Sequence, residues 1–323
     1  MTEQSTSTGA WPTLPADDWF DTIEAVHLWT QVVGKIRLGY SPWLNHSWSV
    51  PLYVSTRGLR TSMIPYGSDA VELELDFIEH RLDIHTTAGQ HREIRLQSQS
   101  VADFYQAVLD AMAAVGMPVS INPMPSEIPD AVRFDLDTER RNYEPSHART
   151  LWRALVQIDR VLTRFRADFK GKASPVHFFW GSFDLATTRF SGRTAPPHPG
   201  GIPNFPDDVA QEAYSHEVTS VGFWPGNRAA PAPIFYAYAY PTPEGFSSAG
   251  VDPDAAFWLD ELAEFALPYA AVVAAEDPDA LLLSFFESTH AAAAELAQWD
   301  RPSLECDHPE GPDWWHNRPH HPA

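Results

Sequence analysis

Apolar side chains between Phe20 and Val33 recur every three or four residues, which is the spacing of one face of a helix. Asp17 and Asp18 stand just before this segment, and aspartate is a residue type that favours the N-cap position. The pattern therefore predicts a helix that begins after these aspartates and runs to about Leu38.

Strict alternation of apolar and acidic residues predicts strands further along the first half. From Val71 to Phe77 every second residue is apolar and its neighbours are acidic, and a turn near Glu79 breaks the pattern. The elements predicted after the first helix are a strand at 46–57, strands within 71–87, a strand at 93–97 and a helix at 101–115 capped by Ser100.

The second half follows a similar order of periodic segments. A helical pattern comes first, alternating segments follow, and helical patterns end the half. The predicted elements are a helix at 146–169, a strand at 174–189, strands at 214–223 and 234–240, and helices at 254–275 and 279–298.

This order of helix, antiparallel strands and helix, found twice, predicts an α+β fold with an antiparallel sheet and helices on one face. It also predicts an internal duplication, in which both halves form one pseudo-twofold sheet of the TATA-binding-protein-like or helix-grip-like class. The predicted regions are a disordered N-terminus (1–10), a first α+β half (11–117), a Pro-rich connection (118–145), a second α+β half (146–305) and a flexible His/Pro-rich tail (306–323).

Composition restricts the class of protein further. The 323 residues carry a net charge of −21, which disfavours nucleic-acid binding, because such binding depends on Lys and Arg at phosphates. No apolar run has the length of a membrane span, and residues 1–9 lack the features of a signal peptide. The single cysteine, Cys306, excludes an intrachain disulfide. We therefore expect a cytoplasmic protein that binds neither nucleic acid nor membrane; composition does not indicate its oligomeric state.

Polar and aromatic residues are unusually dense between 174 and 224. Buried polar groups cost free energy unless they are paired, so this density predicts a polar pocket with aromatic walls. Alternation along a strand from Val176 would place Trp180, Ser182 and Asp184 on one face, and His177, Phe179, Phe183 and Arg189 on the other. The predicted catalytic residues are His177 and His216 as base or acid, with Asp184 and Glu217 as their orienting partners.

Substrate-binding residues are predicted in both halves. His27, Gln31 and Lys35 are four residues apart and would form one polar stripe on a helix, although a solvated face explains such a stripe equally well. Gly34 interrupts this helix, so we expect close approach of backbone or ligand there. The other predicted binding residues are Arg37, His46, Arg57, Trp180, Arg189, Arg193, His198, Tyr214 and Trp224, of which the aromatics alternatively build the core.

Several kinds of chemistry lack their sequence motif. The histidines of the predicted pocket show no His-Glu-x-x-His, His-x-His or 2-His-1-carboxylate spacing, so a divalent metal is an alternative that is not favoured and the cofactor is unknown. The chain has no Gly-x-Ser-x-Gly elbow and no Gly-rich phosphate loop. Acid–base chemistry and anion recognition by arginine are what remain.

Eight short segments resemble those of a known bacterial family, DUF5996, over roughly residues 11–305. The resemblance implies the boundaries of the folded region, and since the family has no assigned function it implies no chemistry. The segments are HLWTQVVGKIRL from His27, NH from Asn45, LYV from Leu52, RGL from Arg57, PVHFFWGSFDL from Pro175, RFSGR from Arg189, APPHPG from Ala195 and YSHE from Tyr214.

These observations favour a small-molecule enzyme with its site between the two halves. Histidine and carboxylate would exchange protons with the substrate, while Arg57 and Arg189 would hold its carboxylate or phosphate. A non-catalytic ligand-binding or sensor module is the first alternative, and a protein-interaction scaffold is the second. Perturbed pKa values in a closed polar cleft favour the enzyme, a dry apolar cavity favours the binding module, and an exposed aromatic patch favours the scaffold.

Overall fold

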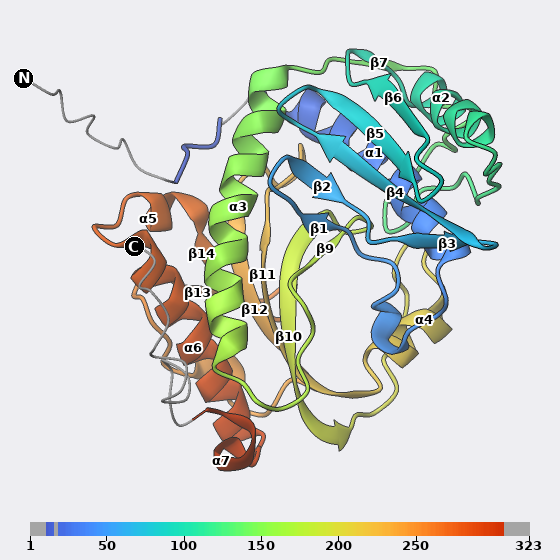
Figure 1. The fold of residues 1–323 in the computed structure, drawn as a ribbon. Helices are drawn as coiled ribbons and strands as arrows, with labels where there is room; N and C mark the ends of the chain where they lie inside the picture. The colour runs from blue at the N-terminus through green and yellow to red at the C-terminus, as the bar shows by residue number, and fades with distance from the viewer. Residues whose placement is uncertain (1–10, 16–18, 307–323) are drawn as a thin grey trace, which may run out of the picture.

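The computed structural model describes residues 11–15 and 19–306, which form an α+β fold with two large antiparallel sheets (Figure 1). The α+β class and the antiparallel pairing predicted from the sequence are confirmed. None of the helices in the described ranges is both long and apolar enough to cross a membrane. The helices are α1 (Phe20–Tyr40), α2 (Val101–Ala114), α3 (Pro145–Ala167), α4 (Asp207–Ala213), α5 (Tyr269–Val273), α6 (Pro278–Leu296) and α7 (Arg301–Leu304), with 3-10 turns η1 (Asn45–Ser47) and η2 (Phe246–Ser248).

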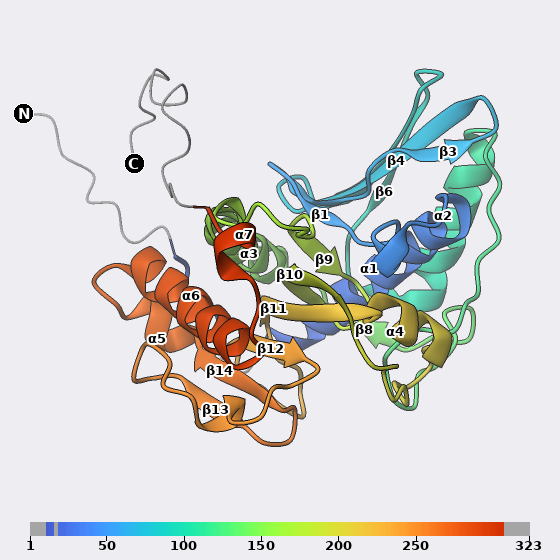
Figure 2. The same cartoon turned by 90° about the horizontal axis from the view of Figure 1, so that it is seen from below.

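The N-terminal sheet follows from strict alternation of apolar and polar residues. Its strands run in the order β1 (Tyr53–Val54), β2 (Gly58–Arg60), β4 (Asp69–Asp76), β5 (Arg81–Thr86) and β6 (His91–Arg95), with β3 (Ile64–Tyr66) paired to β4. Leu73, Leu75 and Ile84 are fully buried on one face, whereas His85 and His91 are exposed on the other. Helices α1 and α2 lie along the apolar face (Figure 2). A separate pair joins β7 (Gln99–Ser100) to β8 (Arg140–Arg141).

The C-terminal sheet is covered on one face by α3 and α6 (Figures 1 and 2). Its order is β13 (Phe257–Leu259), β14 (Glu264–Pro268), β12 (Ile234–Tyr240), β11 (His216–Trp224), β10 (Asp184–Thr194) and β9 (His177–Phe179). The helix-covered face carries fully buried apolar residues such as Leu185, Phe223 and Phe235. The opposite face carries the residues in between, including Asp184 and Tyr236, and forms the floor of a cavity.

The two sheets meet at a single antiparallel bridge within the described ranges. The backbone N–H of Leu52 donates to the Phe178 carbonyl at 2.9 Å, and the Phe178 N–H donates to the Leu52 carbonyl at 2.8 Å. This bridge places β1 beside β9, at the edges of the two sheets. The internal duplication and the TATA-binding-protein-like or helix-grip-like arrangement remain predictions.

The predicted strand at 174–189 is instead a hairpin. β9 ends at Phe179, a turn spans 180–183 with Phe183 at φ 65°, and β10 begins at Asp184. Because Phe179 pairs directly with Asp184, both side chains lie on the same face, which corrects the predicted division of faces. The predicted strand at 46–57 is also wrong in its first part, where His46 and Ser47 have positive φ and form η1.

The predicted helix at 254–275 is wrong as well. This segment contains β13, β14 and only a short helix, α5. Its apolar residues are spaced as a helix would require, but Phe265 and Leu267 are buried in the sheet, where such short runs also occur in central strands. In contrast, α3, α6, β12 and the helix capped by Ser100 agree with the prediction to within two residues, and the Ser100 hydroxyl accepts from the Asp103 N–H at 3.1 Å.

Predictions at the chain ends fall mostly outside the described residues. The proposed N-caps Asp17 and Asp18, the disorder of 1–10 and the flexibility of 307–323 all lie there. The structure does describe Cys306, the first residue of the predicted tail. Its backbone N–H donates to the Asp168 carbonyl at 2.9 Å, and the preceding residue, Glu305, forms a β-bridge with Phe169. Cys306 is therefore attached to the folded part of the chain.

Candidate functional site

A cavity of about 310 Å³ lies over the face of the C-terminal sheet that α3 and α6 leave free. Alternate residues of β10, β11 and β12 form its floor, and α4, the segment around η1 and the turn before β10 form its walls. Helix α4 packs beside the η1 segment, far in sequence but close in space (Figure 1). Aromatic side chains line much of the cavity: Trp48, Phe179, Trp180 and Tyr214 in its walls, and Phe190 and Tyr236 in its floor.

Asp184 brings a carboxyl group to the floor of the cavity, and its side chain is only 8% exposed. Its carboxylate accepts hydrogen bonds from the hydroxyls of Ser182 and Tyr236. Tyr236 stands on β12 and reaches over Gly222 of β11, where a Cβ would lie 2.4 Å from the tyrosine oxygen. Burial raises the pKa of Asp184, although the two hydroxyl donors counteract part of this effect.

Hydroxyl groups extend the polar floor from Asp184 across the sheet. The Tyr236 ring stacks on Tyr238 with centroids 6.0 Å apart, and the Tyr238 and Tyr214 hydroxyls are 2.8 Å apart. Burial raises the pKa of all three tyrosines, so they stay protonated near neutral pH and can donate. The Thr188 and Ser220 hydroxyls form a further pair at 2.9 Å.

Glu127 brings a second carboxyl group to the cavity from the Pro-rich connection. It lies directly over Gly181, where a Cβ would be 1.9 Å from its Oε1. Burial raises the pKa of Glu127 to about 7; the negative charge of Asp184 raises it further, and the positive charge of Lys35 lowers it. At neutral pH this carboxyl group is therefore part protonated.

The predicted stripe on α1 positions the Glu127 segment. Gln31 accepts from the Ser126 N–H at 2.7 Å and donates to the Ser126 carbonyl at 2.9 Å. Lys35 donates to the Ser126 hydroxyl at 3.0 Å, and burial lowers its pKa to about 8. His27 lies 2.9 Å from the Gly181 carbonyl, and burial lowers its pKa to about 4, so it is a neutral donor. Gln31 and Lys35 are buried and His27 is half-buried, so the stripe supports the cavity from behind and is not a solvated face.

His46 lies at another wall of the cavity. Its Nδ1 is 2.9 Å from the Ala213 carbonyl, so Nδ1 carries the proton and Nε2 accepts from Lys172 at 2.5 Å. Burial lowers the pKa of His46, and the charge of Lys172 lowers it further. The His216 ring lies edge-on to His46, with ring centroids 5.8 Å apart. Of the predicted catalytic residues, only Asp184 lines the cavity, while His216 contacts the wall residue His46 without lining it.

His177 is fully buried outside the cavity. It shares the cavity face of β9 but lies behind Trp48 and Tyr53. Their rings lie edge-on to the imidazole, with ring centroids 6.2 and 5.5 Å from its centroid. Neither of its ring nitrogens has a hydrogen-bond partner, and burial lowers its pKa to about 3. Arg37 is buried nearby and donates to the Ser49 carbonyl at 2.7 Å, so it serves the loop rather than the cavity.

The remaining predicted arginines and Glu217 do not reach the cavity. Arg189 lies on the helix-covered face, where it contacts Glu287 at 3.3 Å. Arg193 and Glu217 form a 2.7 Å ion pair near the surface. Arg57 pairs with Asp76 in the N-terminal sheet. Among the cavity residues in the described ranges there is no arginine or lysine, so the predicted anion clamp is not assembled.

Four further residues predicted for the site are divided between the cavity lining and its surroundings. Trp180 and Tyr214 line the cavity, and the Trp180 Nε1 donates to the Val50 carbonyl at 2.9 Å. The Trp180 ring covers Gly34, so a side chain approaches this glycine and not the expected backbone or ligand. His198 stacks on Tyr214 with centroids 4.7 Å apart, outside the cavity, and Trp224 does not line it.

Sequence reasoning missed Glu127, Tyr236, Tyr238 and Glu264. Glu264 on β14 stands next to this floor, and burial, together with the charge of Asp184, raises its pKa to about 7. The tyrosines had a signal, since 234–240 reads Ile-Phe-Tyr-Ala-Tyr-Ala-Tyr with tyrosine at every second position. Glu127 had none, because its place depends on how the Pro-rich connection folds over Gly181.

Comparison with known proteins identifies the family but no activity. No curated protein and no solved structure matches the chain. The model of one family, described as a family of unknown function (DUF5996), matches residues 11–306 and so includes every residue of the cavity. The chain therefore belongs to the DUF5996 family.

Proposed function

We propose that the protein is a small-molecule enzyme that exchanges protons with its substrate through Asp184 and Glu127. The observation that carries this proposal is the pair of carboxyl groups with raised pKa values in one aromatic-walled cavity. Buried carboxyl groups are costly and are concentrated at functional sites. Two hydroxyl donors hold the Asp184 carboxylate, and Gln31 and Lys35 anchor Ser126 beside Glu127. A fixed position is what catalysis requires of its acid and base.

The environments of the two carboxyl groups suit different roles. Asp184 receives two hydroxyl donors, while Glu127 has a pKa of about 7 and stands near the cation Lys35. The negative charge of Asp184 raises the pKa of Glu127, so the protonation of Glu127 depends on the charge of Asp184. Near neutral pH one group can hold a proton while the other accepts one, the arrangement that general acid–base catalysis uses.

The substrate proposed from the structure differs in charge from the one predicted from the sequence. Arginine does not reach the cavity, while two carboxyl groups do. A neutral or amine-bearing molecule with an apolar or aromatic body fits these walls, because aromatic rings attract cations and pack against apolar groups. The volume of about 310 Å³ lies at the small end of ligand cavities, which favours a small substrate.

A metabolite extract tests the proposal without a known substrate. The wild-type protein and the Asp184→Asn and Glu127→Gln variants are incubated with the extract, and NMR spectra follow which metabolites are consumed. We expect consumption with the wild type only, and a Glu217→Gln control, altered in an ion pair outside the cavity, should match the wild type. Metabolite binding without any consumption would replace the enzyme with the ligand-binding module.

A further inference from the structure

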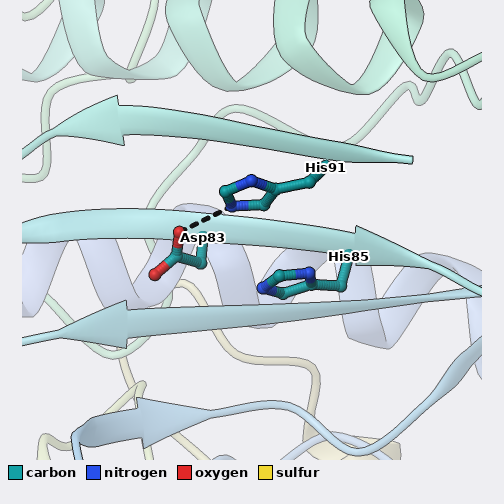
Figure 3. Close-up of side chains that lie close together, drawn as sticks. All are labelled: Asp83, His85 and His91. Atoms are coloured by element: carbon teal, nitrogen blue, oxygen red, sulfur yellow. Dashed lines mark hydrogen bonds and ion pairs between the residues drawn. The ribbon is translucent and has the colours of Figure 1, made fainter. Parts of the chain in front are cut away.

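Three side chains on the solvent face of the N-terminal sheet lie close together. Asp83 and His85 are two residues apart on β5, and His91 on β6 pairs directly with His85, so all three project from one face. One possible ligand atom from each lies within 4.8 Å of the other two. Figure 3 shows both imidazole rings extending from their strands toward the Asp83 carboxylate.

We propose that these residues bind one divalent transition-metal ion of the zinc type. Two imidazole nitrogens and one carboxylate oxygen are ligands that zinc accepts, and three protein ligands leave a fourth position for water. Magnesium and calcium prefer shells made of oxygen, so a set with two nitrogens does not suit them. The residues lie on the other sheet from the cavity, and the proposal is independent of the proposed enzyme activity.

Only small side-chain movements are needed to bring the ligands around an ion. Tetrahedral zinc with bonds of about 2.1 Å separates its ligand atoms by roughly 3.4 Å. The two imidazoles are stacked with centroids 4.4 Å apart and planes at 10°, and both are exposed. They can therefore rotate toward an ion while the strands and the buried Asp83 stay in place.

Arg81 orients the carboxylate that would hold the ion. Its Nε donates to one oxygen of Asp83 at 2.9 Å, and the other oxygen faces His91 Nε2 at 2.8 Å. Metal binding replaces the His91 contact: the neutral ring shifts its single N–H proton from Nε2 to Nδ1 by exchange with water, so that Nε2 and the freed Asp83 oxygen both bind the ion. A partner that fixes a ligating carboxylate in this way supports metal affinity.

Charges on the neighbouring strands favour a cation at this position. Glu72 on β4 is paired with His85, and Glu93 on β6 is paired with Asp83, so both flank the three ligands on the same face. Arg81 is the cation in contact with Asp83, and Glu93 contacts it at 3.1 Å. Glu72 in turn contacts Arg60 at 3.5 Å, so three carboxylates, those of Asp83, Glu72 and Glu93, face two arginines around the proposed ion.

Isothermal titration with zinc chloride tests the site on the full-length protein. We expect one ion per chain at this site, with affinity at least tenfold weaker in His85→Ala and in His91→Ala. Both residues are exposed, so the metal-free variants should fold as the wild type does, which circular dichroism checks. Magnesium chloride at the same concentration should give no binding at this site.

A control variant separates this site from the other histidines of the chain. The sequence also contains His308, His316, His320 and His321, so a variant with all four changed to alanine should keep its zinc affinity and the zinc-induced rise in melting temperature. Loss of binding in this control, or unchanged affinity in both His85→Ala and His91→Ala, would overturn the proposal.

Discussion

Two buried aspartates, one in each sheet, meet very different surroundings. Asp76 at the end of β4 accepts from the backbone N–H groups of Ile78 and Glu79, at 2.7 and 3.0 Å, and pairs with Arg57. Asp184 at the start of β10 receives only two neutral hydroxyl donors. Burial raises the pKa of both, but the backbone donors and the cation bring that of Asp76 below its usual value.

The comparison shows that burial alone does not mark a functional carboxylate. A fully paired group such as Asp76 stabilises a turn, because its charge is compensated wherever the chain is folded. In Asp184 the hydroxyl donors compensate only part of the free energy lost when the carboxylate leaves water. Groups of this kind are concentrated at functional sites. The position of Glu127 beside the same cavity, with the same cause of its raised pKa, extends this contrast to a pair.

The largest effect should come from removing the compensated carboxylate. Asp76→Ala leaves two backbone N–H groups without their acceptor, while the partly exposed Arg57 turns to solvent, so we expect a loss of about 3–4 kcal/mol in the free energy of unfolding. Urea denaturation measures it. The exposed neighbour Glu79, 3.8 Å from Arg57, provides the control, since Glu79→Ala should cost less than about 0.5 kcal/mol. Equal losses in both variants would remove the distinction.

Gly222→Ala tests the path by which Tyr236 reaches Asp184. The added methyl group would lie 2.4 Å from the tyrosine oxygen and 2.7 Å from the Leu185 carbonyl oxygen. We expect a loss of roughly 2–3 kcal/mol, because overpacking of this kind displaces side chain and backbone. Gly39 on α1 has open space around it, so Gly39→Ala should instead be neutral or stabilising by up to about 1 kcal/mol. A Gly222→Ala protein as stable as the wild type would contradict the close passage of Tyr236 over Gly222.

The pH dependence of stability should change in Glu127→Gln. A carboxyl group whose pKa rises from 4.5 to about 7 on folding binds more protons in the folded state between these values. Stability of the wild type therefore falls as pH rises through this window, and the glutamine variant lacks this fall. We expect the variant to gain roughly 1–2 kcal/mol over the wild type at pH 8 and nothing at pH 4. Parallel curves from pH 4 to 8 would contradict the raised pKa.

The smallest effect on stability should come from His216→Ala. This half-buried side chain contacts Ser215 at 3.1 Å and the edge of His46, so its loss should cost about 0.5 kcal/mol or less. Thermal unfolding checks this value. Its contact with the wall residue His46 predicts instead a change in metabolite consumption in the NMR assay. A loss above about 2 kcal/mol would make His216 a structural residue.

The sequence was most informative where periodicity and local chemistry coincide. Long helices such as α3 and α6, the strand β12 and the cap at Ser100 follow from spacing and propensity alone, as does Asp184 as a polar residue of the cavity face. These features depend on residues near one another in the chain.

The rest depends on contacts that no local pattern reveals. The turn at 180–183 reverses the chain, so His177 and Asp184 lie on the same face of the sheet, although strand alternation predicted opposite faces. Arg189 was predicted to hold an anion, but helices cover its face of the sheet and it contacts Glu287 there. Glu127 reaches the cavity only because the Pro-rich connection folds over Gly181. Tertiary packing decides which buried polar residues have a compensating partner and which keep a raised pKa.

The most direct test is a pH titration of the carboxyl carbons by NMR, on protein labelled with carbon-13 at aspartate and glutamate side chains. Assignments come from Asp76→Asn, Asp184→Asn and Glu127→Gln. We predict that the Glu127 resonance titrates near pH 7, that Asp184 titrates above the usual aspartate range, and that Asp76 titrates below it. Titration of Asp184 and Glu127 at ordinary carboxyl values, near 4, would contradict a proton-exchanging pair in the cavity.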